Sequence, residues 1–176
     1  MGRGPVKIER YNPSWSIEYQ RHQRMIELVL DGRIEEIEHI GSTSVEGLAA
    51  KPIIDIGITV TDIDDPTLID RMQKLGYIYR DDREDDLPFR RYFVLIREDK
   101  HLVHVHIVPK EHEFFNAHIA FRDYLRQHKD IRDEYHLLKI RLAHKYKEDR
   151  EGYQQGKSAY IRNITDLALD QLQSLD

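Results

Sequence analysis

The segment KPIIDIGITV constrains the fold most, because it is a run of β-branched residues bounded by Pro52 and a polar turn. Successive side chains of a strand point to opposite faces, so its aliphatic side chains share one face. These are Ile54, Ile56, Ile58 and Val60. The other face carries Asp55, Gly57 and Thr59. The pattern predicts a strand with one face on a core and a small, acidic opposite face, where Gly57 leaves room beside Asp55.

Helices are predicted on both sides of this strand. Asn12 suits an N-cap and Pro13 the first helical position, and Asp31-Gly32 ends that helix. Its apolar stripe consists of Trp15, Tyr19, Met25, Ile26 and Val29. The sequence Thr43-Ser44-Val45-Glu46 has the form of a capping box, so we expect a short helix to start there. Further helices are expected over about 65–75 and 112–127, from about 130, and along the apolar residues between 153 and 172.

Additional strands are predicted next to the central one. RRYFVLIR, the turn EDK and HLVHVHIV indicate a β-hairpin, and residues 77–80 a short strand. Residues 34–40 remain ambiguous: isoleucines three apart favour a helix, whereas brevity and the following glycine favour a strand. The acidic run 81–86 indicates a solvated loop.

The chain of 176 residues is the length of one domain, with an α/β part over 1–110 and a helical part over 111–176 packed on it. The absence of cysteine excludes disulfides, thiolate metal sites and a cysteine nucleophile. No apolar run approaches the roughly 20 residues of a membrane span, and no signal peptide is evident, so we expect a soluble, cytoplasmic protein. A net charge of −5 argues against broad nucleic-acid binding but is compatible with a local basic pocket.

The segment GSTSVEGLAAKPIIDI carries the main candidate site. Gly41 and Ser42, followed by Thr43 and Ser44, lead into a helix start, where small residues let backbone N–H groups approach an anion. Asp55 follows on the strand, and an acidic residue facing a phosphate-binding turn suits a divalent cation that carries a nucleotide. Alternatively, the Gly-Ser pair is only a turn and Asp55 caps the next loop.

EHIGSTSVEGLAAKPIIDI resembles the signature of the GrpB family, a member of the nucleotidyltransferase superfamily. The resemblance continues through GYIYR, HVHIV, FRDYLR and DREGYQQGKSAYI, and so covers nearly the whole chain. It implies an α+β fold: a small mixed sheet flanked by helices, like the catalytic core of DNA polymerase beta, followed by a C-terminal helical half. It also implies that residues 34–40 form a strand.

The resemblance implies a metal-dependent nucleotidyltransferase that acts on a nucleoside triphosphate and an acceptor the sequence does not name. By resemblance, Gly41 and Ser42 match the phosphate-binding turn and Asp55 the first, catalytic acid. The second acid would stand at Gly57, which has no side chain, and HLVHVHIV holds no carboxylate. The alternative is therefore a catalytically degenerate module that binds a nucleotide or related phosphate ligand. The implied cofactor is a divalent metal, Mg²⁺ or Mn²⁺.

Two histidines widen the choice of metal. His104 and His106 are two apart in a strand and share a face, so they could join Asp55 as metal ligands if the strands are neighbours. Imidazole with carboxylate suits Mn²⁺, Zn²⁺ or Ni²⁺ better than Mg²⁺. Alternatively, both are neutral histidines packed under the helical part.

The helical part supplies candidate ligand contacts. Lys157 precedes Tyr160 by three residues, so the two share a helix face. Lys157, Arg122 and Lys51 could hold phosphates, and the Tyr160 ring could stack on a base. Alternatively, Arg122 pairs with Asp123 at the surface and Tyr160 belongs to the core. No membrane partner is expected; a second copy of the chain, as a homodimer, is a candidate partner.

Overall fold

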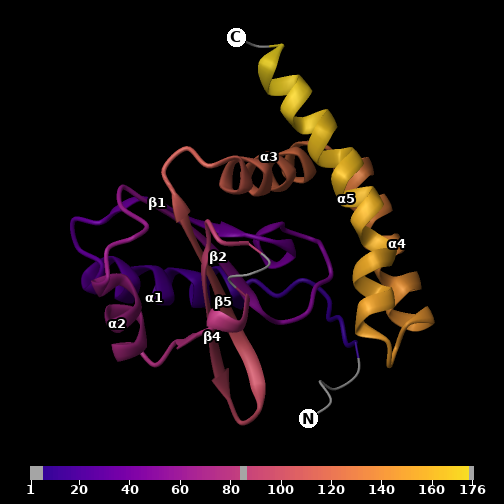
Figure 1. Cartoon of the computed structure of the whole chain (residues 1–176). Helices are drawn as coiled ribbons and strands as arrows, with labels where there is room; N and C mark the ends of the chain where they lie inside the picture. Colours follow the sequence, from indigo (N-terminus) through magenta and orange to yellow (C-terminus); the bar gives the residue numbers. More distant parts are fainter. Residues whose placement is uncertain (1–5, 84–86, 175–176) are drawn as a thin grey trace.

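The computed structural model describes residues 6–83 and 87–174 and contains a five-stranded mixed sheet (Figure 1). Its strands are β1 (Ile34–Ile40), β2 (Ile54–Val60), β3 (Ile78–Tyr79), β4 (Arg91–Arg97) and β5 (Lys100–Pro109). They lie in the order β1-β2-β5-β4-β3, and β2 and β5 are parallel while all other neighbours are antiparallel. The strand at 34–40 and the predicted hairpin are both confirmed.

One face of the sheet packs on the helices α1 (Ser14–Val29) and α2 (Thr67–Lys74). The aliphatic side chains of β2 meet Trp15, Ile26 and Met72 in one buried cluster. The alternation in KPIIDIGITV therefore places the core correctly. Met25 departs from the predicted stripe, since it is 41% exposed. Helix α1 begins one residue later than predicted, with Asn12 Oδ1 accepting from the N–H of Ser14 (3.0 Å).

The other face lies under α3 (Glu113–Gln127), while α4 (Lys129–Lys145) and α5 (Arg150–Gln173) run side by side at one edge of the molecule (Figure 1). The helices α3, α4 and α5 pack on the segment between β1 and β2, where Val45 and Leu48 contact Leu125, Tyr135 and Ile164. The helical part thus rests on the loop that carries the Gly-Ser turn.

Gly57 does not leave an open space beside Asp55, contrary to the sequence interpretation. A Cβ atom at Gly57 would lie 3.1 Å from the ring of Phe115 on α3 and 3.3 Å from Ile40. The glycine is buried and allows α3 to approach the sheet. The volume that the missing side chain leaves at Gly57 is filled by the ring of Phe115.

The predicted helix starting at Thr43 is wrong. Only a single 3₁₀ turn, η1 (Ser42–Ser44), follows Gly41, and Val45 is already extended. The Thr43 hydroxyl does not cap a helix, because it lies 2.9 Å from His39 Nε2 and donates to the carbonyl of Ile53 (3.3 Å). Burial of this threonine in a tertiary contact therefore overrides the local capping pattern.

Within the acidic run, Asp81–Arg83 form a second 3₁₀ turn, η2, in which Asp81 and Asp82 are exposed; positions 84–86 lie outside the described residues. Among residues 6–83 and 87–174, no helix has the length and apolar character needed to cross a membrane.

Candidate functional site

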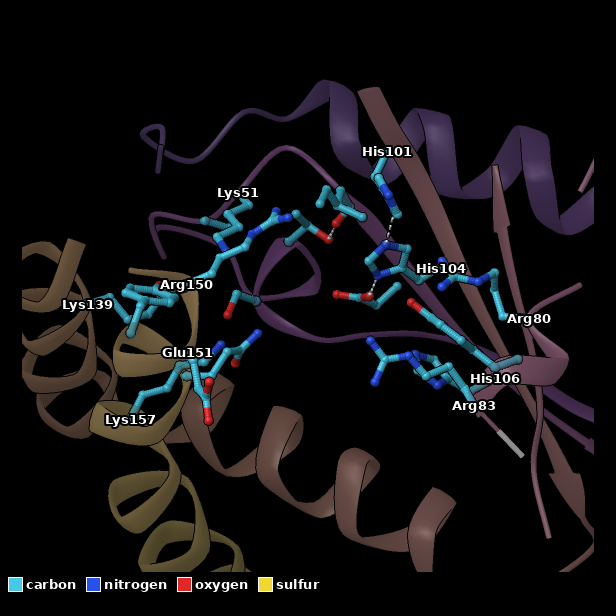
Figure 2. A pocket seen from close by; sticks show the side chains of 18 of the residues that line it. Lys51, Arg80, Arg83, His101, His104, His106, Lys139, Arg150, Glu151 and Lys157 are labelled. Atoms are coloured by element: carbon cyan, nitrogen blue, oxygen red, sulfur yellow. Dashed lines mark hydrogen bonds and ion pairs between the residues drawn. The ribbon is translucent and has the colours of Figure 1, made fainter. Parts of the chain in front are cut away.

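A pocket of about 890 Å³ lies between the sheet and the helices α4 and α5 (Figure 2). Asp55 on β2 and His101, His104 and His106 on β5 line it from the sheet. Ser42 and Thr43 line it from the η1 turn. The pocket therefore joins the Gly-Ser segment, the acidic strand and the helical part, three regions far apart in the sequence.

Positive charge dominates the described lining of this pocket. Seven lining residues are lysine or arginine, and two are carboxylic acids. The basic residues are Lys51, Arg80, Arg83, Arg90, Lys139, Arg150 and Lys157. The acids are Asp55 and Glu151. Asp82, which lies outside the lining, pairs with Arg80 (2.6 Å). The remaining basic residues still outnumber the acids, and in a protein of net charge −5 they create a local field that attracts anions.

A chain of three polar side chains stands at the sheet side of the pocket. His104 Nδ1 lies 3.2 Å from Asp55 Oδ1, and its Nε2 lies 3.0 Å from His101 Nδ1 (Figure 2). The parallel register of β2 and β5 explains the contact, because it pairs Asp55 with His104. Burial raises the pKa of Asp55, but the hydrogen bond and charge of His104 outweigh it, and the pKa lies below its usual value. Asp55 is therefore a carboxylate at neutral pH.

His106 lies on the same strand face but has different partners. Its Nδ1 is 3.1 Å from Arg90 Nη1, and its ring stacks on Tyr92 with centroids 4.9 Å apart. Burial lowers the pKa of His106 to about 3 against the opposing effect of Asp55, and the charges of His118 and Arg90 lower it further. The ring is neutral at physiological pH.

These side chains do not form a preformed metal site. Both ring nitrogens of His104 are engaged, and a guanidinium stands beside His106. Among the described residues, no group of three histidine, cysteine, aspartate or glutamate side chains is placed to hold a metal ion. The structure brings Asp55, His104 and His106 to one pocket, and their binding of a metal stays a prediction.

Gly41 brings the backbone of the turn against the carboxylate. Its φ is +72°, a conformation that glycine adopts readily, and an added Cβ would lie 2.6 Å from Asp55 Oδ2. The next residue, Ser42, lines the pocket and hydrogen-bonds to Tyr135. Position 41 therefore requires glycine for its positive φ and for its close approach to Asp55, and Ser42 forms part of the pocket wall.

Three lysines gather on the helical side of the pocket. The ammonium groups of Lys51 and Lys157 lie 4.9 and 5.1 Å from the centroid of the Tyr153 ring. Lys139 is 2% exposed and donates to the carbonyl of Ala49. Burial lowers the pKa of Lys139 well below its usual value, with further lowering by Lys157 and Lys51 and an opposing effect of Asp55. The lysines therefore repel one another.

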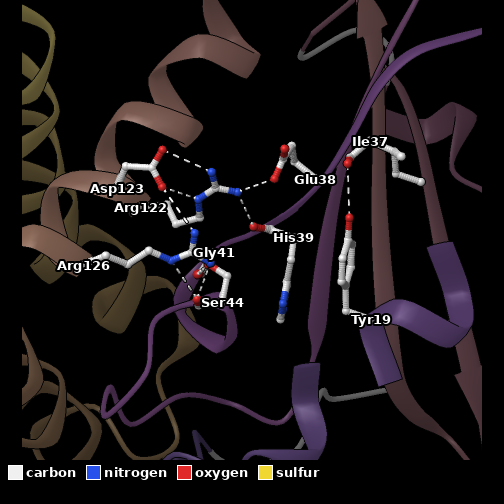
Figure 3. A network of polar contacts seen from close by, with 9 residues as sticks. All are labelled: Tyr19, Ile37, Glu38, His39, Gly41, Ser44, Arg122, Asp123 and Arg126. Carbon is white, nitrogen blue, oxygen red and sulfur yellow. Dashed lines mark hydrogen bonds and ion pairs between the residues drawn. The ribbon is translucent and has the colours of Figure 1, made fainter. Parts of the chain in front are cut away.

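Helices α3 and α4 hold the segment that follows the turn through its backbone. Arg126 donates to the carbonyl of Ser44 through Nε (3.2 Å) and Nη2 (2.8 Å), as Figure 3 shows. Arg132 Nη1 donates to the carbonyl of Glu46 (3.3 Å), and His136 Nδ1 accepts from the N–H of Ala49 (3.1 Å). The shape of this pocket wall thus depends on the helical part.

The structure does not bring Arg122, Tyr160 or Ser44 to this pocket. Arg122 joins α3 to β1, where it pairs with Glu38 (2.6 Å) and Asp123 (2.7 Å) (Figure 3). The Tyr160 ring stacks on Tyr135, and its hydroxyl donates to the carbonyl of Ile131 (3.2 Å). Ser44 faces a second pocket of about 610 Å³ together with Arg126. Arg122 therefore pairs with Asp123 as the alternative interpretation states, but it is buried and not at the surface, and Tyr160 is a partly buried neighbour of the core cluster around Tyr135.

Sequence reasoning missed several lining residues. Arg150 and Tyr153 precede the predicted Lys157 by seven and four residues, which places them on the same face of α5, and this spacing could have revealed them. Lys139 gave no such signal, because a buried lysine in an amphipathic helix is recognisable only once its tertiary neighbours are known. Arg80 and Arg90 stand outside strands and reach the pocket only through the fold.

Fold and site together define a small α+β protein with a cation-lined pocket at an acidic central strand. The chain belongs to the GrpB family, since the family described as "GrpB protein" matches residues 5–167.

Individual proteins and a solved structure are also similar to this chain. The UPF0157 protein YqkA of Bacillus subtilis is 36% identical over 163 residues, which cover 93% of this chain but 47% of YqkA, so the chain spans about half its length. The glutamate-rich protein GrpB of Alkalihalophilus pseudofirmus is 29% identical over 169 residues, covering 93% of this chain and 96% of that protein. The crystal structure of the conserved protein GrpB from Enterococcus faecalis matches with a TM-score of 0.87 and 33% identity, over 95% of this chain and 99% of that chain. The predicted α+β fold is therefore confirmed.

Proposed function

We propose that this protein binds a nucleoside triphosphate or a related phosphate ligand in the pocket beside Asp55. The observation that carries the proposal is the excess of lysine and arginine over acids in the lining. Ammonium and guanidinium groups are the side chains that proteins use to bind phosphate. Burial lowers the pKa of Lys139 and of Lys157, and Asp55 only partly offsets this effect, so an incoming anion would stabilise the charged forms of both lysines.

Binding is better supported than catalysis. Two-metal phosphoryl transfer needs several oxygen ligands around the ions, and β2 offers only Asp55. The position of a second acid, Gly57, lies under Phe115, so a carboxylate there would have no path to the pocket without moving α3. This arrangement favours the degenerate binding module over the active enzyme.

Metal-dependent nucleotidyl transfer to an unidentified acceptor is the second candidate. The placement of the Asp55 carboxylate beside Gly41 and Ser42 favours it, because an acid facing a phosphate-binding turn is the arrangement that such chemistry uses. A transfer assay with α-labelled nucleotide and Mg²⁺ or Mn²⁺ separates the two candidates: label must appear on an acceptor, or on the protein, if transfer occurs.

The binding proposal is tested by calorimetric titration of ATP into the wild type and Lys157→Gln. We expect saturable binding by the wild type and about a tenfold loss in the variant, the usual effect of removing one charge-assisted contact. Lys129→Gln is the matched control, since this lysine is exposed on α4 and outside the pocket lining. Absence of binding by the wild type to all four ribonucleoside triphosphates, or equal losses in both variants, contradicts the proposal.

A further inference from the structure

We propose that the pocket recognises the phosphate chain of its ligand and not the base, so that its ligand class is linear polyphosphate, free or as the tail of any nucleotide. This inference rests on the proposed function and specifies it. It follows from two features of the lining: where the ammonium groups gather, and which surfaces remain for a planar base.

The ammonium groups gather on one wall. Figure 2 shows Lys51, Lys139 and Lys157 on the helical side of the pocket, across from the histidines of β5. They come from the segment before β2, from α4 and from α5, and the ammonium groups of Lys51 and Lys157 lie against the same ring, 4.9 and 5.1 Å from the centroid of Tyr153. A chain of two or three phosphates offers more oxygen atoms to such a group of cations than a single phosphate does. The wall therefore favours a ligand with several adjacent negative charges.

The aromatic rings of the described lining are already engaged within the protein. Tyr153 is 1% exposed and has two ammonium groups against its ring. Tyr92 stacks on His106, and the Arg90 guanidinium lies 4.7 Å from its centroid. Tyr160, which the sequence suggested as a stacking partner for a base, instead stacks on Tyr135. A base entering this pocket would find little aromatic surface to stack on.

Apolar groups are also scarce. Ala50, Ile53 and Leu87 are the aliphatic side chains of the described lining, Gln154 is its side-chain amide, and its histidines have partners within the protein. Pockets for organic ligands are lined mostly by apolar and aromatic groups, and discrimination between similar molecules requires buried hydrogen-bonding partners for each. Strong selection of one base over another is therefore not expected.

The test is a series of calorimetric titrations with ATP, GTP, CTP, UTP, inorganic tripolyphosphate, pyrophosphate and phosphate, without divalent cation. We expect the dissociation constants of the four nucleotides and tripolyphosphate to agree within about threefold, a difference worth little free energy. Pyrophosphate is expected to bind about tenfold more weakly than tripolyphosphate, and phosphate more weakly again, as contacts with charged groups are lost.

Two variants sharpen the result. Lys51→Gln should weaken every triphosphate to the same extent, about tenfold, whereas Gln154→Ala should leave all of them unchanged. A nucleotide that binds more than about threefold tighter than the other nucleotides, or more than about threefold tighter than tripolyphosphate, overturns the inference while the proposed function stands. Failure of all seven ligands to bind overturns the proposed function itself.

Discussion

Gly41 lies against Asp55 with no room for a side chain, because an added Cβ atom would stand 2.6 Å from Asp55 Oδ2. Gly32 has nearly the same φ, +70° against +72°, but an added Cβ there meets nothing within 4 Å. We expect Gly32→Ala to lower stability by about 1 kcal/mol from backbone strain alone. Gly41→Ala should cost clearly more, because the methyl group also collides with Asp55 Oδ2.

Chemical denaturation of both variants measures this difference, and titration with tripolyphosphate measures its effect on binding. Gly41→Ala should bind more weakly, since the turn or the carboxylate must move, whereas Gly32→Ala should bind as the wild type does. Equal stability and equal affinity in the two variants would show that the contact with Asp55 has no role.

A substitution at Gly57 tests whether the second carboxylate expected from the family resemblance could be restored at this position. Gly57→Asp places a carboxylate against the Phe115 ring and Ile40 in a buried position, so we expect a loss of about 3 kcal/mol in stability and no gain in affinity for Mn²⁺. Denaturation and metal titration of the variant check this expectation. Measured against the single variant Phe115→Ala, Gly57→Asp should cost less than it does in the wild type, because the contact with the ring is gone. Wild-type stability of Gly57→Asp together with tighter Mn²⁺ binding would contradict the expectation.

His39 makes the stability of the fold depend on pH. Its ring stacks on Tyr19 at 4.8 Å and is 7% exposed, and burial, partly opposed by Asp55, lowers its pKa to about 4. The unfolded chain titrates near 6.5, so its stabilising effect is complete above pH 6.5 and is lost as the pH falls from about 6.5 to 4.

The pH effect of His39 amounts to about 3 kcal/mol at most. Denaturation at several pH values should therefore show a smaller loss between pH 6.5 and 4 for His39→Gln than for the wild type. The remaining loss in the variant comes from groups such as His106, whose pKa is lowered in the same direction. Identical pH profiles for the two proteins would mean that His39 is not buried as a neutral ring.

Among the helices and strands, the alternation of apolar and polar residues predicted the structure better than the helix-capping motifs did. The alternation in β2 and in the β4–β5 hairpin correctly predicted strands and their apolar face, because burial of one face of a sheet imposes a period of two residues. The capping box at Thr43 failed, since a buried tertiary contact claimed its hydroxyl. The ring over Gly57 and the buried Lys139 could not be read from the sequence, as both depend on how helices pack on the sheet and the loop.

Arg122 joins α3 to β1, and a variant of this residue distinguishes a structural role from a role in ligand binding. It donates to Glu38, to Asp123 and to the carbonyl of His39 (3.0 Å), and it lies outside the main pocket. Arg122→Gln should lower stability by about 1–3 kcal/mol, because α3 and β1 lose their shared hydrogen bonds, while the carboxylates of Glu38 and Asp123 are 43% and 38% exposed and stay solvated. At a temperature where the variant is folded, its affinity for tripolyphosphate should equal that of the wild type. A variant of normal stability with weakened binding would instead place Arg122 in the binding machinery.

At the scale of the whole molecule, the distribution of charge matters more than its sum. The protein is net negative, yet its main pocket holds seven basic and two acidic lining residues. Binding should therefore weaken with ionic strength, by more than about tenfold between 50 and 500 mM salt, because several charge contacts are screened together. Titrations of tripolyphosphate over this range measure the slope; an affinity independent of salt would contradict an electrostatic pocket.

A crystal structure of the protein with bound ATP would show where the phosphates lie. We expect phosphate oxygens within hydrogen-bond distance of at least two of the amino groups of Lys51, Lys139 and Lys157, with the triphosphate near Ser42 and the base making few contacts. Phosphates bound in the second pocket beside Arg126, or an ATP molecule held mainly through its base, would contradict this expectation.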